Sequence, residues 1–112
     1  MLNDIDFDVG NIAYNEFHID FDKTLCEQED SLTEDLLQVE YPNNYLIDLG
    51  WYPECNSNGN FVISVICDFD WEKPVLKKIV ACNQELVRDT LLEAINIVKG
   101  LLKETQEIPL NF

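Results

Sequence analysis

The sequence predicts an α+β fold: an antiparallel sheet of about four to five strands with a long C-terminal helix packed on one face. Apolar residues recur at helical spacing in the last third of the chain, whereas upstream runs alternate between apolar and polar residues as strands do. Short, turn-rich links join these runs, which favours antiparallel neighbours. Because the chain has 112 residues, of which 46% are hydrophobic, residues 1–112 are expected to form a single domain.

The N-terminal part carries the weakest pattern, and residues 1–14 are left unassigned. Apolar and polar residues alternate from Phe17 to Asp22. This alternation predicts an edge-like strand whose outer face presents the carboxylates of Asp20 and Asp22.

Residues 31–41 favour two different structures. Ser31 and Glu34 have the spacing of a capping box, which would open a short helix. From residue 36 onward, however, apolar residues alternate with polar ones, and the turn Pro42-Asn43-Asn44 follows. We therefore predict a strand over residues 36–41.

The centre of the chain predicts three further strands that are joined as a meander. Alternating runs span residues 45–52, 61–69 and 75–81. The link from Pro53 to Asn60 is rich in turn residues and predicts a hairpin with a long loop.

The C-terminal helix is expected to begin after Asn83, which is a favourable N-cap, and to include Lys99 and Lys103 near its end. Its apolar stripe, which includes Ile95, is broad enough to pack on a sheet. Gly100 costs such a helix about 1 kcal/mol relative to alanine. Its presence predicts either a close approach to a strand or the point at which the helix frays.

The charge of the chain is large and unevenly distributed. The net charge is −15, and residues 1–56 contain fourteen acidic residues against Lys23 as their only base. Such a field favours a strongly basic partner or a cation, and it disfavours direct nucleic-acid binding and anionic membranes. No segment approaches the roughly 20 apolar residues of a membrane span, and the N-terminus lacks a secretory signal pattern. We therefore expect a cytoplasmic protein.

Catalytic and cofactor motifs are absent from the sequence. His18 is the single histidine, no phosphate-binding glycine motif occurs, and the four cysteines contain no C-x-x-C pair. We therefore expect reduced cysteines, no enzymatic activity and no cofactor.

A carboxylate-based metal-binding protein is a less favoured alternative. The candidate clusters are Asp4, Asp6 and Asp8 in the first, and Asp68, Asp70 and Glu72 in the second. The first cluster matches three ligand positions of an EF-hand loop, but the required glycine falls one place late, at Gly10. The position of the bidentate glutamate in that loop is occupied by Asn15.

Aromatic residues beside acidic turns suggest a partner-binding surface. Trp51 is expected to close the core. For Tyr52 and Trp71, core packing, with Trp71 covering the helix, competes with a role as interface anchors that acidic neighbours would support by steering a basic partner. The complete candidate set comprises Asp20, Asp22, Tyr52, Glu54, Asp68, Asp70, Trp71 and Glu72.

Two motifs resemble a known family. Ile47-Asp48-Leu49-Gly50-Trp51-Tyr52-Pro53-Glu54 and Asp70-Trp71-Glu72-Lys73-Pro74 lie within residues 34–100, which resemble the bacterial immunity proteins of contact-dependent growth inhibition and related polymorphic toxin systems. The resemblance implies a cytoplasmic protein that is not an enzyme. It also implies that the chain binds and neutralises one cognate toxin domain, often a nuclease.

The acidic charge agrees with that expectation, because nucleases that bind phosphate backbones present basic clefts. A nucleic-acid-mimicking inhibitor that blocks many nucleic-acid-binding proteins is the main alternative.

Overall fold

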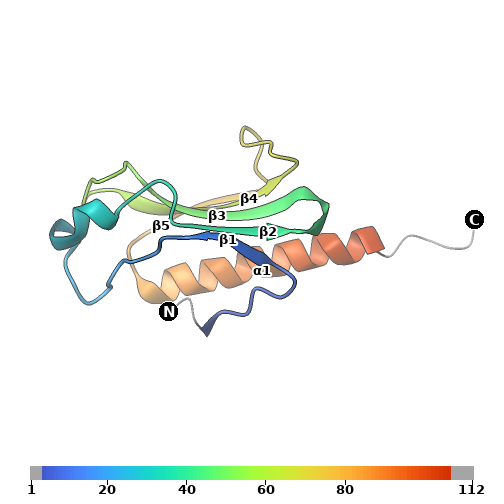
Figure 1. The fold of residues 1–112 in the computed structure, drawn as a ribbon, viewed down its shortest axis with the longest axis horizontal. Helices are drawn as coiled ribbons and strands as arrows, with labels where there is room; N and C mark the ends of the chain where they lie inside the picture. The colour runs from blue at the N-terminus through green and yellow to red at the C-terminus, as the bar shows by residue number, and fades with distance from the viewer. Residues whose placement is uncertain (1–3, 107–112) are drawn as a thin grey trace, which may run out of the picture.

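Residues 4–106 are described by a computed structural model, in which five strands follow one another along the chain and pair in the same order. The strands are β1 (Asn11–Asn15), β2 (Leu37–Tyr41), β3 (Tyr45–Tyr52), β4 (Asn60–Cys67) and β5 (Leu76–Val80), and the helix is α1 (Gln84–Gln106). All neighbouring strands are antiparallel, and α1 lies along one face of the sheet (Figure 1). The predicted α+β architecture is confirmed.

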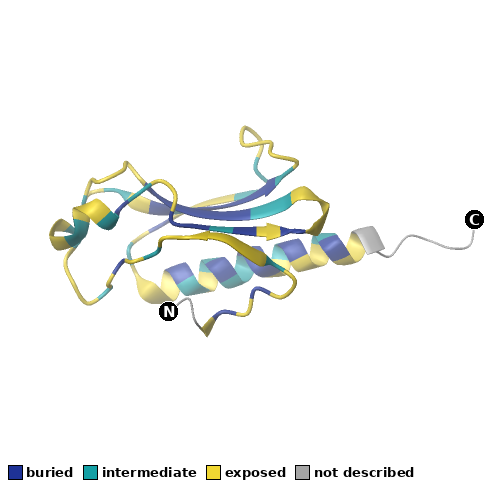
Figure 2. Cartoon of the chain, viewed as in Figure 1, coloured by how far each residue is buried: buried dark blue, intermediate teal, exposed yellow. Residues whose placement is uncertain are grey.

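Alternation along the central strands places the core between the sheet and α1. Ile47, Leu49 and Trp51 of β3 are fully buried and belong to one core cluster with the inward residues of α1. The rings of Trp51 and Phe61 meet edge to face at 4.9 Å between centroids. The Trp51 indole Nε1 donates a 2.8 Å hydrogen bond to the Asn56 carbonyl, so Trp51 closes the core as expected. Figure 2 shows the buried stripe of α1 turned toward the sheet.

The first strand differs from the prediction. The alternating segment 17–22 is not a strand, and β1 is formed by residues 11–15, all of which are exposed. The side chains of Phe17 and Phe21 pack against Phe61 at centroid distances of 5.9 and 6.2 Å. The backbone of Asp20 is hydrogen-bonded to a side chain and not to a neighbouring strand. The Asp20 N–H donates to the Gln28 side-chain oxygen, and the Gln28 side-chain nitrogen donates to the Asp20 carbonyl, both at 2.8 Å.

Strand prediction was otherwise accurate, apart from the end of β4. Residues 37–41 form β2, as the alternation indicated, and no helix follows the capping-box spacing. The strand predicted over 61–69 ends at Cys67, because Asp68 and Phe69 adopt positive φ angles of 54° and 60°. The next strand begins at Leu76, close to the prediction.

The helix begins where the sequence indicates. The Asn83 side-chain Oδ1 accepts a 3.0 Å hydrogen bond from the Leu86 backbone N–H, which is the expected N-cap contact. Neither explanation offered for Gly100 holds, because a Cβ at this position would have no atom within 4 Å and α1 continues to Gln106. Gly100 is an exposed helical position.

No helix among residues 4–106 has both the length and the hydropathy required to span a bilayer. The four cysteines are all free thiols; Cys26 and Cys55 are exposed, whereas Cys67 and Cys82 are partly buried.

Candidate partner-binding face

The face of the sheet turned away from α1, here called the open face, is built by the alternate residues of β2 to β5. Strand register aligns four polar residues in a row across it, since Gln38 pairs with Asp48, Asp48 with Ser64, and Ser64 with Lys77. Residues that pair directly project from the same face of a sheet. The open face therefore combines this polar row with the other outward residues, which include Glu40, Leu46, Tyr52, Val62, Ile66 and Ile79.

The link between β4 and β5, residues 68–75 and here called the Trp71 loop, projects from the open-face side of the sheet (Figure 1). The expectation that Trp71 covers the helix is therefore wrong. Trp71 lines hollows of the open face, and its side chain is about half exposed, at 51%. The loop turns back over the sheet because Asp68 and Phe69 adopt left-handed conformations directly after β4.

A contact between two turns holds the base of the Trp71 loop. Asn43 and Asn44, in the turn between β2 and β3, both have φ angles of 63°. The Asn44 carbonyl accepts a 2.9 Å hydrogen bond from the Asp68 N–H, and the Asn44 side-chain amide donates one of 3.2 Å to Asp68 Oδ1. Asn and Asp tolerate left-handed backbone better than other non-glycine residues, which explains these residue types here.

Two hollows lined by described residues lie on the open face, and Trp71 lines both of them. The larger, here called the Asp48 pocket, has a volume of about 410 Å³ and is lined by Asp48, Tyr52, Val62, Ser64, Ile66, Trp71, Pro74, Lys77 and Ile79. The second has a volume of about 400 Å³ and is lined by Gln38, Glu40, Tyr41, Asn44, Tyr45, Leu46, Phe69 and Trp71. Together they extend across strands β2 to β5.

Asp48 is the most unusual residue of this face. It is only 4% exposed although it carries a carboxylate, and it lies on the central strand β3. Its Oδ1 accepts a 3.0 Å hydrogen bond from the Gln38 side-chain amide. Burial raises the pKa of the Asp48 carboxyl above its ordinary value, the Gln38 hydrogen bond opposes this rise, and the nearby charge of Asp35 adds to it.

Tyr52 joins the Asp48 pocket to the acidic part of the molecule. It is exposed at the end of β3 and lines the pocket. The pKa of its phenol is raised, first by burial and then by the charges of Asp48, Glu34, Asp35 and Glu54. Three of these four carboxylates lie outside the pocket, so one end of the open face is bordered by negative charge.

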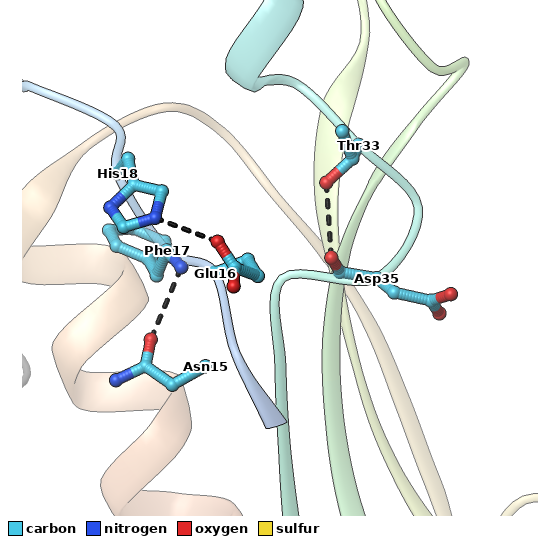
Figure 3. A network of polar contacts seen from close by, with 6 residues as sticks. All are labelled: Asn15, Glu16, Phe17, His18, Thr33 and Asp35. Carbon is cyan, nitrogen blue, oxygen red and sulfur yellow. Dashed lines mark hydrogen bonds and ion pairs between the residues drawn. The ribbon is translucent and has the colours of Figure 1, made fainter.

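A third hollow, of about 430 Å³, lies beside this border, and four of its eight lining residues are acidic; it is here called the acidic hollow. Its lining residues are Tyr14, Glu16, His18, Asp30, Ser31, Thr33, Asp35 and Glu54. Figure 3 shows the local contacts: His18 Nε2 and Glu16 Oε2 are 2.9 Å apart, and the Thr33 hydroxyl donates a 3.0 Å hydrogen bond to the Asp35 carbonyl. The residues that line this acidic hollow are mostly exposed. The only side chains in its lining that His18 could activate as nucleophiles are the hydroxyls of Tyr14, Ser31 and Thr33.

The structure gathers only part of the candidate set. Tyr52 and Trp71 line the same pocket, although the sequence separates them by nineteen positions. The Trp71 loop also carries three carboxylates, those of Asp68, Asp70 and Glu72, of which Asp70 and Glu72 are exposed. The remaining candidates lie elsewhere: Glu54 lines the acidic hollow, and Asp20 and Asp22 lie in the segment before η2, a 3₁₀ helix over Leu25–Ser31.

The acidic clusters considered as metal ligands serve as turn acceptors. Asp6 Oδ1 accepts a 2.8 Å hydrogen bond from the Asp8 N–H, and Asp70 Oδ1 accepts one of 3.3 Å from the Lys73 N–H. Within residues 4–106 no group of three or more histidine, cysteine or carboxylate side chains has a metal-binding arrangement. The described residues therefore give no support to the metal-binding alternative.

Sequence reasoning missed Asp48, Ser64 and Lys77 as members of the site. Asp48 and Ser64 occupy the polar positions of alternating strands, which usually indicate solvent exposure. The available signal was the tight turn at residues 42–44, which joins the predicted strand 36–41 to the first strand of the predicted meander. In the structure β3 lies between β2 and β4, so a carboxylate within β3 has a strand on both sides.

Comparison with known proteins identifies no relative. No family model, no curated protein and no solved structure matches the chain. What the chain does must therefore be inferred from its own residues.

Proposed function

We propose that this chain is an immunity protein: it binds one cognate toxin domain, a nuclease with a basic phosphate-binding cleft, and neutralises it without a catalytic step of its own. The observation that carries the proposal is the open face, a sheet surface with aromatic side chains at its pockets and carboxylates at its border. The sequence motifs that resemble immunity proteins contribute residues to this same face, since one contains Asp48 and Tyr52 and the other contains Trp71.

The aromatic residues supply the first part of the argument. Tyr52 and Trp71 present large side chains to solvent at the Asp48 pocket, and Phe69 does so at the neighbouring hollow. Tyrosine and tryptophan are enriched among the residues that contribute most to protein–protein binding. Their exposure on one face leaves all three side chains accessible to a partner.

The charge supplies the second part. A net charge of −15 disfavours the compact state through self-repulsion, and complementary charge on a partner relieves that repulsion. Acidic residues at the border of a binding face accelerate the encounter with a basic partner. A nuclease cleft that binds phosphates is a basic surface of this kind.

Co-expression tests the proposal. The toxin domain encoded beside this gene should arrest growth of the host cell when produced alone, and co-production of this chain should restore growth. Failure to restore growth, with both proteins detected, would contradict the immunity function. Inhibition of unrelated nucleases by the purified chain would instead support the nucleic-acid-mimicking alternative.

Two truncations of exposed apolar side chains localise the effect. Trp71 on the open face and Leu86 on α1 are exposed to nearly the same extent, at 51% and 49%. Trp71→Ala should weaken toxin binding by at least about tenfold, as expected for an interface anchor, whereas Leu86→Ala should leave it unchanged. The opposite pattern would place the partner on the helical face.

A further inference from the structure

We propose that the Asp48 pocket receives an arginine side chain of the basic protein partner, with the guanidinium bound to the Asp48 carboxylate and stacked on an aromatic wall. The inference rests on the proposed function for the kind of partner, and it adds the chemical group that the open face recognises.

The floor of the pocket presents polar atoms that the fold does not use. The Gln38 amide occupies only Oδ1 of Asp48, and Oδ2 accepts no hydrogen bond from the described residues. Among the described residues, however, every fully buried side-chain nitrogen or oxygen has a hydrogen-bond partner. Oδ2 therefore reaches the pocket surface, and the same reasoning applies to the hydroxyl of Ser64, which is 7% exposed and pairs with Asp48 across the strands.

The carboxylate on this floor forms no ion pair with any described residue. Lys77 lines the same pocket, but it forms no ion pair with Asp48, and its strand is separated from β3 by β4, roughly 10 Å at the spacing of neighbouring strands. A buried carboxylate without a cation is costly, and its burial raises the pKa of Asp48 accordingly. A cation that entered the pocket would remove that cost.

The walls favour arginine over lysine as this cation. Trp71 and Tyr52 contribute aromatic rings, while Val62, Ile66 and Pro74 contribute apolar surface. A guanidinium is planar, weakly hydrated and able to stack on an aromatic ring while it donates hydrogen bonds to a carboxylate and a hydroxyl. A lysine ammonium is a strongly hydrated point charge, which such a pocket would dehydrate at greater cost.

The surrounding charges define the side from which the cation approaches. Glu34, Asp35 and Glu54 act on Tyr52 at one border of the pocket, whereas Lys77 lies on β5 at the other. The electrostatic potential is therefore more negative at the Tyr52 border than at the Lys77 border. An arginine on an incoming chain is attracted to the Tyr52 border. This asymmetry orients the partner on the open face.

Titration with blocked peptides tests the pocket directly. The probe is Ac-Gly-Arg-Gly-NH₂, with the lysine analogue and the neutral citrulline analogue as comparisons, and the signal is the Trp71 indole N–H in ¹H–¹⁵N spectra of the full chain. We expect the arginine peptide to shift this signal to saturation, the lysine peptide to bind more weakly, and the citrulline peptide to leave it unmoved.

Matched variants separate specific recognition from general attraction to an acidic protein. Asp48→Asn and Asp89→Asn remove the same charge by the same chemical change, but Asp89 lies exposed on α1. Asp48→Asn should weaken the arginine peptide by at least about tenfold, because a charge-assisted hydrogen bond is lost, whereas Asp89→Asn should not. Trp71→Ala, at an exposed loop position, should weaken it by about threefold or more; because this variant lacks the indole signal, wild type and variant are compared through the backbone amide signals of Val62 and Ser64, which line the same pocket. Equal binding by wild type and both Asp variants, or citrulline binding as tight as arginine binding, would overturn the proposal.

The co-expression assay keeps this inference distinguishable from the proposed function. If the chain protects against its toxin and Asp48→Asn protects equally well at matched protein levels, the pocket inference fails while the immunity function stands. If the pocket binds the arginine peptide but the neighbouring toxin is not neutralised, the immunity function fails while the pocket stands.

Discussion

In the proposed arginine site, Asp48 serves binding at the expense of the fold. A buried carboxylate with one neutral hydrogen-bond donor is less stable than the same group in water. Natural proteins accept such costs chiefly where a site requires the group. Asp48 therefore invites separate measurements of stability and of binding.

We predict that Asp48→Asn raises the melting temperature at pH 7 by a few degrees. Asparagine has no charge to desolvate, and its Oδ1 retains the acceptor for Gln38. Because the folded-state pKa of Asp48 lies above the unfolded value, its destabilising effect is present at neutral pH and is relieved as the pH falls through the folded pKa toward 3.8. Thermal unfolding of both proteins from pH 7 to pH 3.8 should show the gap closing, and a constant gap would contradict a buried charge as its cause.

Tyr41 anchors the N-terminal segment to the sheet. Its hydroxyl donates a 2.9 Å hydrogen bond to the Phe7 carbonyl, in a part of the core that also contains Ile5. Burial, followed by the charges of Asp8 and Asp6, raises the pKa of this phenol to about 12. The protonated hydroxyl is therefore the form that the fold stabilises.

We predict that Tyr41→Phe lowers the free energy of unfolding by about 1–2 kcal/mol at pH 7, since the Phe7 carbonyl loses its donor. The folded-state pKa exceeds the unfolded value, so the contribution of Tyr41 is complete below pH 10 and is lost as the pH rises toward about 12. Urea unfolding at pH 7, 10 and 11.5 should therefore show the two proteins converging at alkaline pH. A difference that grows with pH would contradict the assigned hydrogen bond.

At the scale of elements, backbone proximity decides what each glycine does. A Cβ on Gly50 of β3 would lie 1.9 Å from the Glu34 carbonyl oxygen, whereas a Cβ on Gly100 of α1 would have no atom within 4 Å. Gly50 is thus required for the segment before β2 to cross β3 closely. At Gly100, by contrast, no contact requires a glycine, and a side chain would fit.

We predict opposite effects for the same substitution at these positions. Gly50→Ala should destabilise by about 1–3 kcal/mol, because the crossing backbone must shift to admit the methyl group. Gly100→Ala should stabilise by about 0.5–1 kcal/mol through helix propensity alone. Chemical denaturation of both variants measures the effects, and a destabilised Gly100→Ala would show an unrecognised contact at the helix end.

The helix is held by its buried stripe. Ile95 is 3% exposed and faces the core, while its neighbour Asn96 is exposed. We predict that Ile95→Asp unfolds the protein, because it places an unpaired charge between α1 and the sheet, and that Asn96→Asp leaves the fold intact. Circular dichroism distinguishes the two, and a folded Ile95→Asp would mean that α1 packs through another face.

Elements with a buried face were predictable from the sequence, and those without one were not. The central strands and α1 alternate or repeat because one side of each meets the core. β1 is exposed along its whole length, so its sequence carries no such pattern. The segment 17–22 has the alternation of a strand but pairs with no strand. Phe17 and Phe21 alternate because their rings pack against Phe61, and the backbone of Asp20 is hydrogen-bonded by the Gln28 side-chain amide instead of by a neighbouring strand.

The site was predictable only in its aromatic members. Tyr52 and Trp71 are conspicuous as aromatic residues beside acidic turns. Their meeting in one pocket depends on two left-handed residues after β4, which return the loop over the open face. Asp68 is a residue type that tolerates this conformation, but Phe69 is not, and neither is a glycine, so the sequence did not indicate two consecutive left-handed residues here.

At the scale of the molecule, the distribution of charge matters more than any single acidic residue. The acids of the N-terminal half border the open face through Glu34, Asp35 and Glu54, and the Trp71 loop adds three more. A basic partner that approaches the open face therefore meets negative charge on both the sheet border and the loop.

We predict that association with the cognate toxin depends steeply on salt. Between about 0.01 M and about 1 M salt the Debye length falls from about 30 Å to about 3 Å. The association rate should then fall by about tenfold or more, while the dissociation rate changes little. Stopped-flow or surface-binding kinetics separate the two rates, and an association rate independent of salt would show that the acidic residues do not steer the encounter.

The alternation of β3 has a consequence for how this protein can diverge. Ile47, Leu49 and Trp51 face the helix, while Leu46, Asp48 and Tyr52 belong to the open face. Neighbouring positions in one strand therefore differ in their constraints: the first set packs in the core, and the second set is the one that our proposal assigns to recognition. If the open face binds as proposed, replacing every second residue of β3 would change the surface offered to a partner and leave the residues that pack against the helix unchanged.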